Sequence, residues 1–491
     1  MFEAAELGKK LSKSEYAAAL PELRESLLAA HFAIKDAGVP VLIIVSGVDG
    51  AGKAELVHRL NEWLDPRGVD THASWQSSDE EEERPHNWRF WRRLPAKGRI
   101  GIFFGSWYTP PILDRVYDRT KKRHFDVEMD RIVFLEQMLA QDGVLIIKLW
   151  FHLPKKVHKI NLKEMAKNPR KHWRVMSADW DLLKNFDEFV SVSERAIRLT
   201  DSAEAPWHVV EASDRRYREL TSGRIIVESI QKCLAAPKME GAKRVGIKKK
   251  SERDERTILD AVDLSQEMSG EKYDLLLKQY QGELSRLVWK ANQKKVSSVI
   301  VFEGWDAAGK GSAIRRVTGA MDPQFYRVIP IAAPTDEERA HHYMWRFWRH
   351  LPRAGKLVIF DRSWYGRVLV ERVEGFARTD EWQRAFVEIN DFEEQLIRHG
   401  VVLSKFWLHI GKDEQLRRFK LRQEDVTKQH KITEEDWRNR RKWDAYKLAV
   451  NEMVERTSTA QTPWTLVAGN DKRTARIQIL RTICENLETK L

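Results

Sequence analysis

Apolar residues gather in short runs in the second half of the chain, and each run ends at a polar or glycine-rich stretch. The runs are "VSSVIVFEG" (296–304), "KLVIFDRSW" (356–364), "VVLSKFWLHI" (401–410) and "PWTLVAGNDK" (463–472). Short β-branched runs of this kind predict buried strands. Segments with helical spacing follow at 311–321 and 473–487. Strands that alternate with helices predict an α/β fold, a parallel sheet sandwiched by helices.

Polar residues lie where these predicted strands end. A glycine loop begins at Gly304, Asp361 follows the second run, and Asn470 and Asp471 follow the last. Ligands of open parallel sheets bind beyond the carboxyl ends of the strands. We therefore expect a site at this edge of the sheet.

The pattern of the second half repeats an earlier one at a constant interval of 257 positions. "GVDGAGKAE" (47–55) answers "GWDAAGKGS" (304–312), "WRFWRRLP" (88–95) answers "WRFWRHLP" (345–352), and "SWY" occurs at 106–108 and 363–365. A shared interval over such distances indicates an internal duplication. We predict tandem domains over 1–235 and 266–491, joined by a basic linker over 236–265.

Composition limits the class of protein. Of the 491 residues 42% are hydrophobic, enough for globular cores, and no run reaches the roughly 18 apolar residues that span a membrane. The two cysteines and the lack of an apolar signal core near residue 1 predict a cytoplasmic protein. The net charge of +12 favours polyanionic partners, although a basic soluble surface is the alternative.

The loop at 304–312 resembles the phosphate-binding pattern G-x-x-x-x-G-K-[ST], with Gly304, Gly309 and Lys310 in place. Backbone N–H groups of such a loop, here including Ala307, Ala308 and Gly311, cradle phosphate oxygens, and the lysine adds a point charge. A tight turn with an ordinary surface lysine is the alternative. Gly311 stands where a Ser or Thr would hold magnesium.

Two aspartates could replace the missing hydroxyl as magnesium ligands. Asp306 lies inside the loop, and Asp361 ends the neighbouring predicted strand, as a Walker-B aspartate does. Magnesium in phosphoryl transfer is typically held by one or two carboxylates plus phosphates and water. A turn residue and a cap are the alternatives for the two aspartates.

Basic side chains follow the second aspartate. Arg362 is adjacent to Asp361, and Arg367 and Arg372, a little further on, are candidates for binding a nucleotide. The highly charged segment 412–447 could form a helical lid over phosphates. Its candidate phosphate-binding residues are Arg418, Arg422, Lys428 and Lys431. A salt-bridged surface helix is the alternative for this segment.

Five blocks of the second half, in order, resemble the polyphosphate kinase 2 family. They are "GWDAAGKG", "WRFWRHLPRAGKLVIFDRSWYGRVLVERVEGF", "KFWLHIGKDEQLRRFKLR", "RRKWDAYKLAVNEMVERT" and "PWTLVAGNDKRTAR". The resemblance implies a fold like that of P-loop nucleotide kinases, and magnesium-dependent phosphoryl transfer between inorganic polyphosphate and nucleotides. It implies catalytic roles for Asp306, Lys310, Asp361 and Arg362, with the two aspartates serving the metal. The run "DVTKQHK" (425–431) departs from the family's lid pattern, with Val426 in place of proline and His430 in place of tryptophan.

The first half keeps the glycine loop but changes the residues around it. At the 257 interval Asp49 and Lys53 remain, whereas Phe104 replaces Asp361 and Gly105 replaces Arg362. We therefore expect the N-terminal domain to be degenerate, kept for stability, for contacts in a homo-oligomer or for regulation, with residual polyphosphate binding through Lys53 as a further option.

The resemblance of fused two-domain members to polyphosphate:AMP phosphotransferases favours AMP as acceptor and ADP as product. Phosphorylation of nucleoside diphosphates is the alternative within the family. An ATP-dependent nucleotide kinase and a basic nucleic-acid-binding protein with a vestigial loop are the alternatives outside it. We expect neither a nucleic-acid nor a membrane partner, since the chain shows no recognisable helix-turn-helix, RRM or KH signature.

Overall fold

The computed structural model describes residues 1–74, 76–170, 172–236, 257–426, 429 and 432–491. The described residues form two compact units, each of which takes a short segment from the other half of the chain. The first unit comprises 1–77, 89–236 and 335–342, and the second comprises 78–88, 257–334 and 343–491. The predicted linker 236–265 lies mostly outside the described residues. Its last part does not, because Ile258–Ala261 forms the short helix η4 and the Leu259 N–H donates to Asn451 Oδ1 at 3.1 Å in the second unit.

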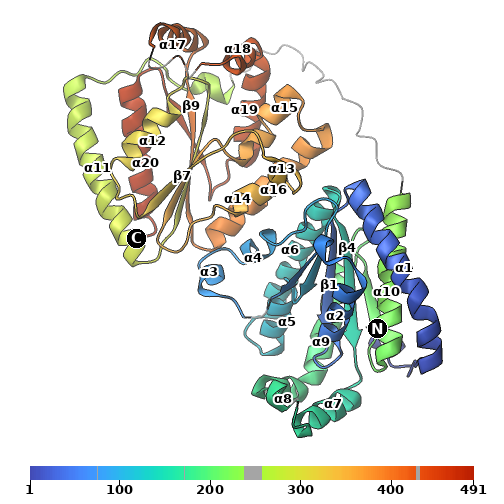
Figure 1. The fold of residues 1–491 in the computed structure, drawn as a ribbon. Helices are drawn as coiled ribbons and strands as arrows, with labels where there is room; N and C mark the ends of the chain where they lie inside the picture. Colours follow the sequence, from blue (N-terminus) through green and yellow to red (C-terminus); the bar gives the residue numbers. More distant parts are fainter. Residues whose placement is uncertain (75, 171, 237–256, 427–428, 430–431) are drawn as a thin grey trace. The chain divides into compact units, whose positions relative to one another are not determined.

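Each unit is built, within the described residues, on a parallel sheet of five strands (Figure 1). In the second unit the strand order is β10-β9-β6-β8-β7, with every neighbouring pair parallel. The strands are β6 (Ser298–Gly304), β7 (Tyr326–Pro330), β8 (Leu357–Asp361), β9 (Val402–His409) and β10 (Trp464–Ala468). Burial of β6, β8 and β9 on both faces explains why their sequences are runs of apolar residues.

Helices cover both faces of this sheet, as the sequence predicted (Figure 1). On one face lie α11 (Gly270–Gln293), α12 (Lys310–Thr318) and α20 (Lys472–Glu488). On the other lie α15 (Val370–Glu374), α16 (Thr379–Arg398) and α19 (Trp443–Thr457). Two helices, α17 (Lys412–Glu424) and α18 (Glu434–Arg441), follow β9 in the position predicted for a lid.

The first unit repeats this architecture, with strand order β2-β3-β1-β4-β5. Its strands are β1 (Val41–Gly47), β2 (Val69–Ala73), β3 (Ile100–Phe104), β4 (Leu145–His152) and β5 (Trp207–Glu211). Its principal helices are α1 (Lys13–Ala37), α2 (Lys53–Trp63), α5 (Thr109–Val116), α6 (Lys122–Gln141), α7 (Lys155–Lys167), α8 (Ser177–Lys184), α9 (Phe186–Thr200) and α10 (Arg215–Ala235). The two sheets share one strand order, which confirms the duplicated α/β fold.

A search of the described residues found no helix long and apolar enough to cross a bilayer.

Candidate active site

The glycine loop connects the central strand β6 to helix α12 in a conformation that needs glycine at its first position. Gly304 has φ +150°, and a Cβ atom there would lie 2.6 Å from the Leu408 carbonyl oxygen. Gly309 at the N-cap of α12 also has positive φ. Lys310 begins the helix, and its Nζ donates to the Gly304 and Trp305 carbonyls at 2.7 and 3.3 Å. Burial lowers the pKa of this ammonium group. Gly311 lies in the first turn of α12.

The neighbouring strand β8 brings Asp361 and Arg362 to the loop. Asp361 is in register with Phe302 of β6. Arg362 adopts φ +66°, and its Nη2 donates to Asp306 Oδ1 at 3.2 Å. Burial alone would lower the pKa of Arg362, but the Asp306 carboxylate raises it, so that the net direction is upward. The structure thus brings together the four residues proposed as catalytic.

A pocket with a cavity volume of about 80 Å³ lies at the loop. It is lined by Glu303, Gly304, Trp305, Asp306, Arg362, Gly366, Leu369, Val370, Trp407, Gln415, Glu435, Asn439 and Tyr446. Loop, strand end and lid helix α18 all contribute to its wall.

Several of these pocket residues were not singled out from the sequence. Asn439 of α18 donates from Nδ2 to Asp306 Oδ2 at 2.9 Å, which ties the lid helix to the loop. Trp305 stacks on Trp443, with ring centroids 3.8 Å apart and planes 9° apart. Glu303 is 5% exposed, accepts a hydrogen bond from the Ser363 hydroxyl at 2.8 Å, and has its pKa raised by burial.

A signal for Glu303 was present in the duplication. Its counterpart in the first half is Ser46, so this carboxylate is lost together with the counterparts of Asp361 and Arg362. Comparison of the two loops one residue further upstream would have found it.

Arg418, on the predicted lid helix α17, donates hydrogen bonds to backbone carbonyl groups of the loop. It is 4% exposed, and its five N–H donors are all engaged. Nη1 donates to the Ala307 and Ala308 carbonyls at 3.0 and 2.9 Å, Nη2 to the Gly469 and Asn470 carbonyls at 2.7 and 2.9 Å, and Nε to Glu414 at 2.6 Å. Binding of phosphate by Arg418 stays a prediction, because in this conformation no donor remains for it.

Three other predicted basic residues, Arg367, Arg372 and Arg422, are not among the residues that line this pocket. Arg367 pairs with Glu371 at 3.2 Å and lies over the Tyr343 ring, and Arg372 pairs with Glu452 at 2.7 Å. Arg422 is half-buried in the last turn of α17. Lys428 and Lys431 lie outside the described residues. The roles predicted for these five residues stay predictions.

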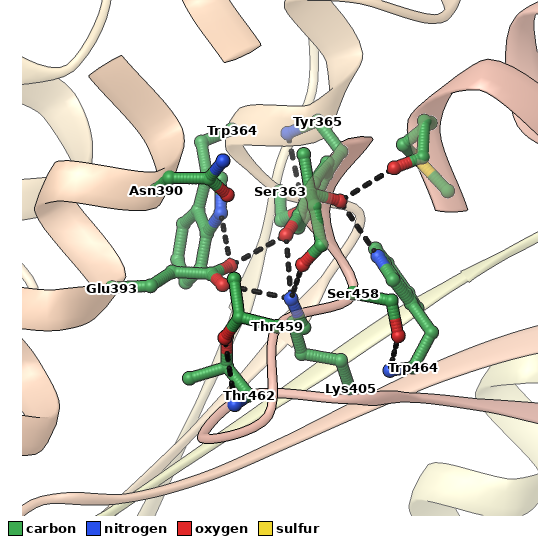
Figure 2. A network of polar contacts seen from close by, with 12 residues as sticks. Ser363, Trp364, Tyr365, Asn390, Glu393, Lys405, Ser458, Thr459, Thr462 and Trp464 are labelled. Atoms are coloured by element: carbon green, nitrogen blue, oxygen red, sulfur yellow. Dashed lines mark hydrogen bonds and ion pairs between the residues drawn. The ribbon is translucent and has the colours of Figure 1, made fainter. Parts of the chain in front are cut away.

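A buried polar network holds the turn that follows Arg362 (Figure 2). Trp364 Nε1 and the Tyr365 hydroxyl both donate to Glu393 Oε1, at 3.1 and 2.6 Å. Lys405 Nζ donates to Glu393 Oε2 at 2.7 Å, and also to the Tyr365 hydroxyl and the Thr457 carbonyl. Fully satisfied networks of this kind rigidify a core.

The first unit contains the same network. Trp107 and Tyr108 donate to Glu136 at 3.1 and 2.6 Å, and Lys148 Nζ donates to Glu136 at 2.7 Å and to the Thr200 carbonyl at 2.8 Å. The network therefore survived in a unit that lost Asp361 and Arg362. Its role is to fix the turn rather than to take part in chemistry.

Comparison with known proteins agrees with this geometry. The family model described as Polyphosphate kinase 2 (PPK2) matches residues 10–237 and again 267–491. A polyphosphate:AMP phosphotransferase of Pseudomonas aeruginosa is 50% identical over 99% of both chains, and one of Acinetobacter johnsonii is 37% identical over 91% of both. A crystal structure from Pseudomonas aeruginosa PA01, assigned to polyphosphate kinase 2, superposes with a TM-score of 0.90 at 49% identity, covering 100% of this chain and 99% of that one. The chain belongs to the polyphosphate kinase 2 family.

Proposed function

We propose that this protein transfers a phosphoryl group from inorganic polyphosphate to AMP, giving ADP, at the site in the second unit. The observation that carries the proposal is the meeting of Lys310, Asp306, Asp361 and Arg362 at one loop, beside a pocket that Asp306 and Arg362 line. The full-length relatives named polyphosphate:AMP phosphotransferases support AMP as the acceptor.

The transfer is a displacement at the terminal phosphorus of the polyphosphate chain. A phosphate oxygen of AMP forms the new P–O bond, and the bond to the bridging oxygen of polyphosphate breaks. The donor leaves one phosphate shorter, and the electron pair of the broken bond stays on its new terminal oxygen. Positioned charge supplies most of the catalysis in such a reaction.

Each site residue has a defined task in this proposal. The N–H groups of the loop and Lys310 hold phosphate oxygens, and Arg362 neutralises charge that develops on the transferring group. Asn439 holds Asp306 in place from the lid side. The buried network around Glu393 keeps the turn that carries Arg362 rigid.

The donor set fits a magnesium ion. Within the described residues, no side-chain hydrogen bond or ion pair is recorded for Asp361, so that its carboxylate is available as a ligand. No group of three or more acidic, histidine or cysteine side chains that could hold a metal was found among the described residues. In this proposal Asp306 and Asp361 would share the ion with substrate phosphates and water, as magnesium sites of kinases do. The ion would neutralise charge on the phosphates.

One product assay tests the proposal. The full-length chain is incubated with magnesium and polyphosphate in the absence of ATP, with AMP or ADP as separate acceptors, and the products are separated by chromatography. We expect ADP from AMP at a rate well above that of ATP from ADP. Faster conversion of ADP would instead assign the protein to nucleoside diphosphate phosphorylation, as in the relative named ADP-polyphosphate phosphotransferase, which is 39% identical over 45% of this chain. Reaction only when ATP is supplied would contradict polyphosphate as donor.

A further inference from the structure

The first unit has a pocket at the same place in its fold as the active-site pocket of the second. Its cavity volume is about 80 Å³, the same as that of its counterpart. Its lining includes Gly47, Asp49, Gly105, Ile112, Leu113, Trp150, Leu182 and Phe189, each 257 positions before a residue that lines the other pocket. The duplication therefore preserved the cavity as well as the loop.

The chemistry of the lining has changed while the volume has not. Leu182 stands where Asn439 lies in the second unit, Phe189 where Tyr446 lies, and Ser46 where Glu303 lies. Phe104, which replaces Asp361, also lines the pocket. Two polar side chains of the wall have thus become apolar, while Asp49, Lys53 and Ser46 keep polar groups in the lining.

The changes account for a different pairing inside the loop. In the second unit Asp306 accepts hydrogen bonds from Arg362 and Asn439, and Lys310 is left to the loop carbonyls. Gly105 and Leu182, the counterparts of these two donors, have no side-chain N–H group. Asp49 instead pairs with Lys53, with Oδ1 2.7 Å from Nζ. Burial favours the neutral acid, but the Lys53 charge outweighs it and lowers the pKa of Asp49.

Two buried polar groups in this pocket lack a partner among the described residues. Trp150 Nε1 and Ser46 Oγ make no hydrogen bond with any described residue. Their residues are only 2% and 8% exposed, so that both groups are buried. Both residues line the pocket. Buried donors and acceptors are normally paired, and a molecule bound in this pocket would supply partners for these two.

We propose that this pocket is a second ligand site, which binds a nucleoside monophosphate without transferring phosphate. The phosphate would lie at the loop N–H groups and Lys53, and the base against the apolar wall of Leu182, Phe104 and Phe189. Trp150 and Ser46 would hydrogen-bond polar atoms of the nucleoside. The absence of counterparts for Asp361 and Arg362 makes the site a binding site alone.

A nucleotide fits this pocket better than a polyphosphate chain. Asp49 neutralises Lys53, so the loop offers little net charge to a polyanion. The aromatic and aliphatic wall would contribute nothing to binding a string of phosphates. A planar base, by contrast, gains from burial against it.

The test is the number of AMP molecules bound per full-length chain, measured by equilibrium dialysis without polyphosphate. We expect two sites in the native protein. Lys53→Ala should remove one of them, and Asp49→Asn should strengthen the same one by about tenfold, because it frees the lysine for phosphate. Effects in opposite directions from two residues of one ion pair cannot come from general unfolding.

Two further variants serve as controls for the location of the second AMP site. Lys310→Ala, the matched change in the second unit, should leave the site in the first unit intact. Leu113→Trp should fill the first pocket and remove its site while the circular dichroism spectrum stays native. A native chain in which Lys53→Ala removes no AMP site, or in which Asp49→Asn does not strengthen the site that Lys53→Ala removes, would overturn the proposal. These binding data need no turnover, so they are distinguishable from a failure of the phosphotransfer reaction.

Discussion

Asp361 is the residue on which the magnesium assignment depends most directly. It ends β8 beside the loop, and its counterpart in the first unit is a phenylalanine. Asp361→Asn preserves the shape and removes the charge, so we expect turnover to fall by at least about 10²-fold, because a misplaced metal removes a main electrostatic contribution.

The measurement is the initial rate of ADP formation over a range of magnesium concentrations. Asp444→Asn, an exposed aspartate of α19, is the matched control and should retain native turnover. Near-native activity of Asp361→Asn at ordinary magnesium concentrations would remove Asp361 from the site.

Glu303 offers a test that links activity to stability. Burial raises the pKa of its carboxyl, so the folded state binds this proton more tightly than the unfolded state does. The stability that this group contributes is therefore greatest at acid pH and is lost as the pH rises through the folded pKa. Glu303→Gln retains an oxygen that accepts from the Ser363 hydroxyl and lacks this dependence.

We expect Glu303→Gln to raise the melting temperature at pH 8 and to leave it almost unchanged near pH 4.5, while it lowers turnover. A gain in stability with a loss of activity is typical of a residue kept for function. The comparison requires thermal unfolding curves and rates at several pH values. A variant with lower stability at pH 8 and unaltered turnover would show that Glu303 serves the fold alone.

At the scale of elements, the sequence predicted the strands that carry the site. The predicted runs 296–304, 356–364, 401–410 and 463–472 contain β6, β8, β9 and β10. Three of these strands, β6, β8 and β9, are buried on both faces, and such strands are continuous apolar runs. The edge strand β7 was missed. Its Arg327 and Val328 are exposed and it ends in Pro330, so that its sequence lacks both an apolar run and a clean alternation.

The helix that supplies a guanidinium group to the loop could not be predicted from periodicity. Arg418 of α17 donates to the Gly469 carbonyl in the second unit, whereas Arg218 of α10 donates to the equivalent Ala212 carbonyl in the first. The counterparts of these arginines are Asn161 and Ala475. In both units an arginine therefore donates to the equivalent backbone carbonyl group, but the arginine comes from a different helix in each.

This exchange predicts a rescue. Arg418→Ala should lower the free energy of unfolding of the second unit by about 3 kcal/mol, because it leaves four carbonyl groups without their buried donor and removes one of the two arginines that pair with Glu414. Ala475→Arg in that background places a guanidinium group on α20, the counterpart of the helix that carries Arg218 in the first unit. The space beside Gly309 is open to receive it, because no atom lies within 4 Å of a Cβ atom built at that glycine.

Urea unfolding of the single and double variants measures the effect. We expect the double variant to recover about half of the loss, and Ala475→Arg alone to be no more stable than the native chain. Equal stability of the single and double variants would mean that the two arginines are not interchangeable supports.

At the scale of the whole molecule, the duplication was readable from the sequence, but its consequence for each pocket was not. The replacements Phe104 and Gly105 predicted a degenerate first site from charge alone. The pairing of Asp49 with Lys53 and the retention of the cavity depend on side chains from separate helices, since Leu182 of α8 and Phe189 of α9 both line the pocket. Such packing is not visible in one-dimensional spacing.

The division of labour between the units leads to the last prediction. In both units a lysine is the first residue of the helix that follows the glycine loop. The loops alone would therefore predict that both units transfer phosphate. Phosphoryl transfer depends on several charges held together, and only the second unit has Asp361 and Arg362 beside its lysine. We therefore expect Lys310→Ala to lower turnover by at least about 10²-fold, and Lys53→Ala to leave most of it.

The comparison is made in the full-length chain, at matched folding by circular dichroism and with saturating polyphosphate and AMP. Saturation matters because Lys53→Ala could still alter the apparent affinity for AMP if the first pocket binds it, without altering the rate of transfer. The double variant should be as slow as Lys310→Ala alone, since the first unit adds no turnover of its own. Equal losses from the two single variants would instead mean that the first unit transfers phosphate, and that a site with Phe104 in place of the second carboxylate can still hold its metal.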